Sequence, residues 1–299
     1  MLDGYGQGIV ILLCINCIAA LGISLLTGFT GIFSLGHAGY MAVGAYVAAI
    51  LTVEYGVHWL PAILLGGLLA MLVSFVIGVP TLRLLGDYYT IASLGLGEAI
   101  RLLLENGGDI TLGARGYPGI DGFTTLPVAV GFLVALSAAM FLLINGNFGR
   151  AFKACRDDYL AASLLGFHTA RYRVLSLAIS GFYCGVAGAL MAGFMSFIQP
   201  VMFDGGKSTE LTAVVVFGGL GSMSGCLLGS AILTLVTELF RPISQYRMLI
   251  YGLVLVVIMV ARPEGLLGQN ELSWSYLKRL FRRKGRRVGT IGSEGSETR

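Results

Sequence analysis

Long apolar runs recur along almost the whole 299-residue chain, with only short polar stretches between them. Charged residues make up 12% of the sequence, whereas a soluble domain carries about 25%. This number of charged residues is too small to cover a protein surface that faces water on all sides. Lipid must therefore be the solvent for much of the surface. The 44 glycines suit close helix packing in a membrane. The sequence therefore predicts an all-α, polytopic transmembrane helical bundle.

Nine segments are apolar enough to be candidate spans, given that a membrane helix needs about 20 apolar residues. They are residues 9–26, 38–53, 60–80, 88–104, 126–144, 174–198, 211–218, 226–240 and 248–261. The 211–218 segment is too short to cross alone, so either residues 199–210 help it cross or it is a half-helix. The crossing version is favoured, because an even number of spans must separate the basic segments 145–173 and 278–287 if both lie on the same side. We expect one transmembrane domain of about 8–10 spans over residues 1–268. The remaining tail, 269–299, is basic and in part disordered by composition.

Lysine and arginine gather in two segments, the 145–173 loop and residues 278–287 of the tail. The positive-inside rule places both in the cytoplasm, which predicts an external N-terminus and a multi-pass protein of the cell inner membrane. No basic region precedes the first apolar run, so we expect that run to be a retained span rather than a cleaved signal. The basic tail is expected to bind anionic membrane lipid, and no nucleic acid.

The 145–173 loop is the longest of the predicted internal loops. It combines small residues (Ala161, Ala162 and Gly166) with charged ones (Asp157 and Asp158). This composition suits a short helix outside the bilayer against which another protein can pack closely. An ordinary charged loop that obeys the positive-inside rule has the same composition, and composition alone does not choose between the two.

Several motifs resemble those of one known family. Residues 160–166, Leu-Ala-Ala-Ser-Leu-Leu-Gly, resemble the E-A-A coupling segment of ABC importer permeases, with Leu160 in place of the acidic residue. The others are Thr-Gly-Phe-Thr-Gly-Ile-Phe-Ser-Leu-Gly-His-Ala-Gly-Tyr at 27–40, Gly-Arg-Ala at 149–151, Arg-Asp-Asp at 156–158, Phe-Gly-Gly-Leu-Gly-Ser-Met-Ser-Gly at 217–225 and Arg-Pro-Glu-Gly-Leu-Leu-Gly at 262–268. In this order the chain resembles the branched-chain amino acid ABC transporter permease family (LivH/LivM type), closer to LivM.

The resemblance implies a membrane-spanning permease subunit that translocates branched-chain amino acids or related small solutes. It implies as partners a homologous second permease subunit, two cytoplasmic ATPase subunits and an extracytoplasmic solute-binding protein. It also implies that the segment with Asp157, Asp158, Ala161, Ala162 and Gly166 couples the permease to an ATPase. The sequence has no G-x-x-x-x-G-K-[ST] phosphate loop, so we expect a transport subunit that needs no cofactor, with ATP hydrolysis on separate chains.

Two glycine-rich stretches, 28–39 and 218–225, predict interrupted helices, because glycine weakens a helix by about 1 kcal/mol relative to alanine. Interrupted helices in two parts of a transporter point to its pathway, since their free backbone groups must face protein or water. Tight turns between spans are the alternative. The candidate path residues are Asn16, Ser34, His37, Glu98, Gly218, Gly219 and Gly221.

Three of these polar residues also have structural explanations. Asn16 can hydrogen-bond a neighbouring helix, and Glu98 can pair with Arg101 on one helix face. His37 either lines the path or caps a helix.

Two other function classes stay open on the residues alone. The chain could be a stand-alone secondary transporter or channel for small solutes, or a membrane-embedded enzyme. Uptake driven by an ion gradient alone would favour the first, and activity of the isolated chain on a peptide or lipid would favour the second.

Overall fold

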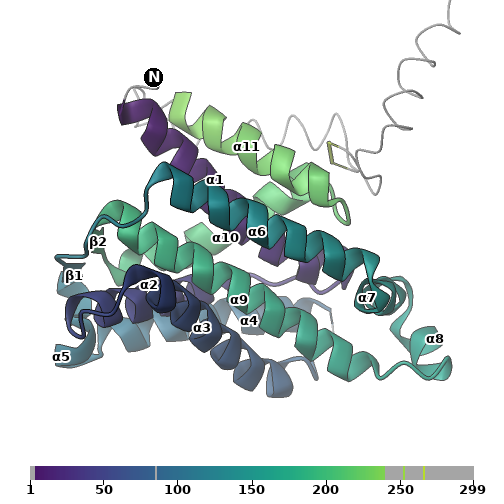
Figure 1. The fold of residues 1–299 in the computed structure, drawn as a ribbon. Helices are drawn as coiled ribbons and strands as arrows, with labels where there is room; N and C mark the ends of the chain where they lie inside the picture. Colours follow the sequence, from purple (N-terminus) through teal and green to yellow (C-terminus); the bar gives the residue numbers. More distant parts are fainter. Residues whose placement is uncertain (1–3, 85, 240–251, 253–264, 267–299) are drawn as a thin grey trace, which may run out of the picture.

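The computed structural model describes residues 4–84, 86–239, 252, 265 and 266. The predicted 248–261 span, apart from Gly252, and the 269–299 tail lie outside the described residues. Long helices dominate the described chain (Figure 1): α1 (Gly4–Ser24), α2 (His37–Val53), α3 (Trp59–Thr81), α4 (Asp87–Glu105), α6 (Leu126–Asn145), α9 (Thr169–Met195), α10 (Gly205–Gly218) and α11 (Met223–Leu239). The prediction of an all-α membrane bundle with interrupted helices is confirmed.

Shorter elements lie between the long helices. They are the π-helical turn η1 (Leu25–Phe29), α5 (Gly108–Thr111), the 3-10 turns η2 (Gly113–Arg115) and η3 (Pro200–Phe203), α7 (Asn147–Asp157), α8 (Tyr159–Leu164), and the strands β1 (Tyr117–Pro118) and β2 (Phe197–Ile198). The two strands pair antiparallel, with Tyr117 opposite Ile198. Figure 1 places β1, β2 and α5 at one end of the bundle and α7 and α8 at the other. We call these the β end and the α8 end.

Among the described residues, four helical stretches are long and apolar enough to cross a membrane: Gly4–Phe29, Trp59–Thr81, Leu126–Asn145 and Thr169–Met195. Local sequence explains where some of them begin. Pro127 lies in the first turn of α6, where its missing N–H has no helical partner to lose. Exposed leucines cover much of the outside of α3, and Val134, Phe141 and Leu142 are exposed on α6, as expected of helices whose solvent is lipid.

The α10 helix begins at Gly205, six residues before the predicted segment, because Asp204 caps it by accepting a hydrogen bond from Lys207 N at 2.9 Å. Its 14 residues span about 21 Å at 1.5 Å per residue. That is shorter than the ~30 Å hydrocarbon core. However, β2 before it lies at the β end, and Gly221 after it lies beside Arg156 of α7 at the α8 end, so the segment agrees with the alternative in which residues 199–210 help it cross.

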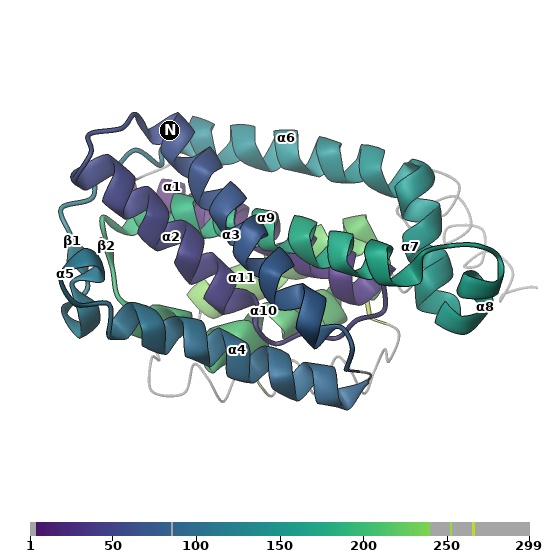
Figure 2. The same ribbon diagram turned by 90° about the horizontal axis from the view of Figure 1, so that it is seen from below.

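The α9 helix runs through the middle of the bundle beside α1, α2 and α3 (Figures 1 and 2). Its packing depends on glycine. A Cβ on Gly44 of α2 would strike the carbonyl of Gly185 on α9, and a Cβ on Gly66 of α3 would lie 2.8 Å from the carbonyl oxygen of Gly44. The three helices cross so closely that main chain packs on main chain, which small residues allow in a membrane bundle.

Candidate functional site

The first helix interruption covers residues 30–36, between η1 and α2. Some of its backbone groups are paired with serine and threonine side chains from other helices. Leu35 N donates to Ser93 Oγ of α4 at 3.0 Å, and the carbonyl oxygen of Ser34 accepts from Thr212 Oγ1 of α10 at 3.3 Å. This is how a non-helical segment inside a membrane protein keeps its polar groups paired without water.

His37 is the first residue of α2 and is fully buried. Its Nε2 lies 2.9 Å from Ser180 Oγ on α9, while the backbone N–H of the next residue, Ala38, donates to Ser208 Oγ of α10 at 3.0 Å. The imidazole therefore bonds a neighbouring helix and does not cap its own. The end of the first break is held by α9 and α10 together.

The second interruption lies at residues 219–222, between α10 and α11. Gly219 has φ +115° and Gly221 has φ +92°, conformations that favour glycine because other residues carry a Cβ that clashes there. A Cβ on Gly218 would lie 2.5 Å from the carbonyl oxygen of Gly225, so α10 and α11 pack closely beside the break. Both predicted glycine-rich stretches thus contain non-helical backbone that packs against protein.

The two breaks meet at Arg156 of α7. A Cβ on Gly31 of the first break would lie 2.9 Å from Arg156 Cγ, and Gly28 lies in η1 directly before that break. Its Nη1 donates to the carbonyl oxygen of Gly28 at 3.2 Å, and a Cβ on Gly221 would lie 2.6 Å from the same nitrogen. A Cβ on Gly28 would lie 2.7 Å from the backbone nitrogen of Gly221. The guanidinium also pairs with Asp157 at 3.0 Å. One side chain therefore connects the segment outside the main bundle to both interruptions.

No role for Arg156 is predicted from the sequence, where it appears only within the Arg-Asp-Asp motif. An arginine beside two aspartates is a signal of an ion-pair network, but its backbone partner lies 128 residues away. Only the folded chain brings them together.

Asn16 and Glu98 lie apart from this meeting point. Asn16 donates to Thr234 Oγ1 of α11 at 3.2 Å, about 18 Å along the helix from Gly28 at 1.5 Å per residue. Glu98 pairs with Arg101 at 2.7 Å and accepts from Gly205 N at 2.6 Å. The geometry thus supports helix packing for Asn16, and ion pairing plus capping of α10 for Glu98.

The coupling residues predicted from the sequence lie in and around α8 and have partners within the chain. Asp158 caps α8, its Oδ1 accepting from Leu160 N at 2.8 Å and Ala161 N at 3.0 Å. Gly166, at φ +89°, ends the helix in a Schellman motif, with Phe167 N donating to the carbonyl oxygen of Ala162. The start and the end of α8 therefore account for an aspartate at 158 and a glycine at 166, whether or not a partner docks there.

The outer surface of α8 is apolar although the helix lies at one end of the molecule. Leu164 is 88% exposed and Leu165 is 77% exposed, with Leu160 also exposed nearby. Aromatic contacts of Phe148, Phe152 and Phe167 with Tyr172 hold the α7–α8 segment on α9. A fixed short helix that presents leucines is suited to docking another protein. The leucines were not predicted as site residues, because within an apolar sequence three more leucines carry no signal.

The sequence is similar to that of known transport proteins over most of its length. The family model described as branched-chain amino acid transport system / permease component matches residues 7–260. The high-affinity branched-chain amino acid transport system permease protein LivM of Escherichia coli is 33% identical over 287 residues, covering 85% of this chain and 68% of the relative. The LivH permease protein of the same-named system in Salmonella typhimurium is 25% identical over 283 residues, covering 85% and 91%.

A third relative belongs to a different import system. The autoinducer 2 import system permease protein LsrC of Yersinia pseudotuberculosis is 30% identical over 214 residues, covering 64% of this chain and 60% of the relative. No solved structure matches the chain.

Proposed function

Because the chain belongs to the family of permease components of branched-chain amino acid transport systems, we propose that it carries branched-chain amino acids or related small solutes across the cell inner membrane. It is a multi-pass permease subunit of an ATP-binding cassette importer, and the resemblance to LivM and LivH supports this substrate class. The likeness to LsrC keeps other small solutes within the proposal.

The proposed partners are a homologous second permease, two cytoplasmic ATPase subunits and an extracytoplasmic solute-binding protein. Similarity to both LivM and LivH, whose names assign them to a high-affinity branched-chain amino acid transport system, supports a second permease related to this chain. The chain itself has no phosphate-loop motif for ATP. ATP hydrolysis is therefore proposed to occur on the ATPase subunits and to reach this chain through α8.

The meeting of both helix breaks at Arg156 is the observation that carries the mechanism. We propose that an ATPase moves the α7–α8 segment, and that Arg156 transmits this movement to the carbonyl of Gly28 and to the turn at Gly221. Non-helical turns change shape more easily than continuous helices, since fewer main-chain bonds must break. The path for solute would open and close where Ser34, His37 and the Gly218–Gly221 turn lie.

Replacing Arg156 with glutamine tests both the function and this mechanism. In proteoliposomes that hold the whole complex, wild-type protein is expected to take up leucine, isoleucine or valine only with ATP. Arg156→Gln should lower uptake at least tenfold while ATP hydrolysis and subunit assembly persist, because a charge-assisted hydrogen bond worth about 1.5–3 kcal/mol is lost. The measurement pairs radiolabelled uptake with phosphate release.

Arg150→Gln is the matched control, since Arg150 lies on the same helix, is exposed and bonds Asn147. Its uptake should stay near the wild-type rate. Uptake driven by an ion gradient without ATPase subunits would instead identify a secondary transporter. Normal uptake by Arg156→Gln would remove Arg156 from the mechanism.

We also propose that the α8 end, with the 145–173 segment, and the 269–299 tail lie in the cytoplasm and that the β end lies outside. The concentration of arginine and lysine in both segments supports this orientation. With a membrane-impermeant maleimide, Tyr55→Cys at the β end should be labelled in intact cells. Arg150→Cys, or a cysteine in the tail, should be labelled only after permeabilisation.

The background of this labelling experiment is expected to be low. All five native cysteines are buried. Burial also raises the pKa of the Cys155 thiol, against an opposing effect of Arg173, so that less of the reactive thiolate is present at neutral pH. Labelling of Arg150→Cys in intact cells would reverse the proposed orientation.

A further inference from the structure

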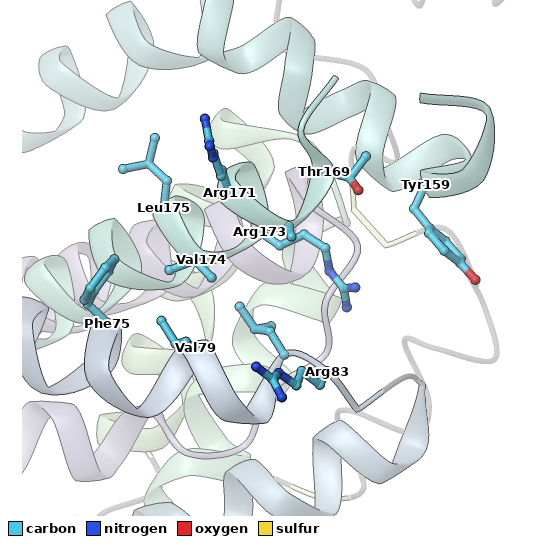
Figure 3. A pocket seen from close by; sticks show the side chains of 11 residues that line it. Phe75, Val79, Arg83, Tyr159, Thr169, Arg171, Arg173, Val174 and Leu175 are labelled. Atoms are coloured by element: carbon cyan, nitrogen blue, oxygen red, sulfur yellow. The ribbon is translucent and has the colours of Figure 1, made fainter. Parts of the chain in front are cut away.

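An open cavity of about 790 Å³ lies at the α8 end between the end of α3 and the start of α9 (Figure 3). Apolar side chains of both helices form one part of its lining: Phe75, Val79, Leu82, Val174 and Leu175. Polar and charged side chains form the other part: Arg83, Tyr159, Thr169, Arg171 and Arg173. We call this cavity the Arg83–Arg173 groove.

Arg83, in the turn that follows α3, and Arg173 of α9 share one side of the groove. Figure 3 shows Arg173 reaching from α9 toward the side where Arg83 lies, while Arg171 points to the opposite side. Within residues 4–84 and 86–239, no carboxylate pairs with any of the three. Like charges on one opening repel each other unless an anion lies between them, so the groove is electrostatically complementary to an anionic group.

The apolar lining of the groove continues along the outside of α3. Phe75 and Val79 are about half exposed, and Leu72 and Val76, on the same helix, are each 60% exposed. Acyl chains are the solvent of such a surface in a membrane. The groove therefore offers guanidinium groups at the end of the bundle and an apolar track that leads from them toward its middle.

We propose that the Arg83–Arg173 groove binds an anionic phospholipid, with its phosphate between Arg83 and Arg173 and an acyl chain along Val79 and Val76. Guanidinium groups suit phosphate oxygens because they donate two parallel hydrogen bonds. Basic pockets between membrane helices bind lipid headgroups in this way. A soluble anion would use the arginines alone and leave the apolar track without an occupant.

The proposed site has a consequence for coupling that rests on the proposed function. Tyr159, the first residue of α8, lines the groove together with the start of α9. A bound phospholipid would contact both elements and hold α8 at a fixed height relative to the membrane surface. Lipid binding itself does not depend on the transport assignment.

Native mass spectrometry of the full-length chain, released from nanodiscs that contain phosphatidylglycerol and phosphatidylcholine, tests the site. Wild-type protein should retain phosphatidylglycerol in preference to phosphatidylcholine. The Arg83→Gln/Arg173→Gln variant should bind it at least tenfold more weakly, because each arginine near the surface adds to the attraction for anionic lipid. Val79→Asp should also weaken retention of phosphatidylglycerol, since it places a carboxylate, which carries the same charge as the lipid phosphate, where the acyl chain is proposed to lie.

The matched control is Arg115→Gln/Arg150→Gln, which removes two exposed arginines from other parts of the chain and should retain the lipid as the wild type does. Equal retention by the Arg83→Gln/Arg173→Gln variant would overturn the proposal, because the lipid would then be bound elsewhere on the chain. Displacement of the lipid by millimolar inorganic phosphate would identify a small-anion site instead. Retention of phosphatidylcholine at the same level would also overturn it. These lipid-binding results do not depend on transport, so a failure of ATP-driven uptake would contradict the proposed function without affecting the lipid site.

Discussion

Replacing Leu164 with aspartate is expected to abolish ATP-driven uptake while the membrane bundle stays folded. Leu164 is 88% exposed on α8, so the substitution removes little packing within the chain. In the proposed complex the same side chain is buried against an ATPase subunit. Burying a leucine contributes about 1.5–3 kcal/mol, and an unpaired carboxylate in its place adds a desolvation cost.

The measurement is co-purification of the ATPase subunits together with uptake in proteoliposomes. ATPase retention should fall at least tenfold, because each 1.4 kcal/mol corresponds to about a factor of ten in affinity. Ile110→Asp is the control: Ile110 is 70% exposed on α5 at the opposite end and should keep the ATPases bound. Wild-type retention by Leu164→Asp would exclude the outer face of α8 as the docking surface.

Leu164 is a sharper probe than the residues that the coupling motif marks. Gly166 has φ +89°, so any side chain there strains the end of α8 whether or not a partner binds. Asp158 caps α8, and removal of a cap costs about 1 kcal/mol. Charge reversal at Asp158 would therefore disturb the helix as well as the interface.

Replacing Gly44 with valine is expected to prevent assembly of the bundle core. Its Cβ would strike the carbonyl of Gly185, and the carbonyl oxygen of Gly44 already supports the close approach of Gly66. Rigid main-chain atoms cannot turn aside as a flexible side chain can, so α2, α3 and α9 would have to separate. Overpacking of a core costs about 1–3 kcal/mol, and separation of three helices is expected to exceed that range.

Thermal unfolding in detergent, read by fluorescence size-exclusion chromatography, measures this effect. Gly44→Val should give little monodisperse protein, or a Tm lowered by more than 10 °C, given that 1 kcal/mol shifts Tm by about 2–4 °C in a chain of 150–250 residues. Gly131→Val on α6 is the control, because a Cβ there meets nothing within 4 Å. A Gly44→Val protein with unchanged Tm would show that α2 and α9 can move apart at this crossing without loss of stability.

Hydrophobic length alone was enough to locate several spans. The segments predicted at 60–80 and 126–144 are α3 (Trp59–Thr81) and α6 (Leu126–Asn145), since a long apolar run can satisfy its backbone in lipid only as a helix. The glycine density likewise located both interruptions. These properties are local, so each can be read from one stretch of sequence.

The start of a helix is harder to predict from the sequence when its first turn is polar. The α10 helix starts in a segment with Lys207 and Glu210, which the apolar pattern excludes. In the structure these two pair at 3.2 Å, and Asp204 and Glu98 both accept bonds from the first backbone N–H groups. The polar residues are compatible with the helix only because their partners lie nearby.

The connections between distant segments depended on the tertiary structure alone. Arg156 bonds the carbonyl of Gly28 across 128 residues, and His37 contacts Ser180 across 143. Composition and spacing identify each of these residues as polar or flexible, but a hydrogen bond is decided by which atoms come within about 3 Å. The helix crossings, with Gly44 against Gly185, set those distances, and so the packing of the bundle determines which polar side chains can act together.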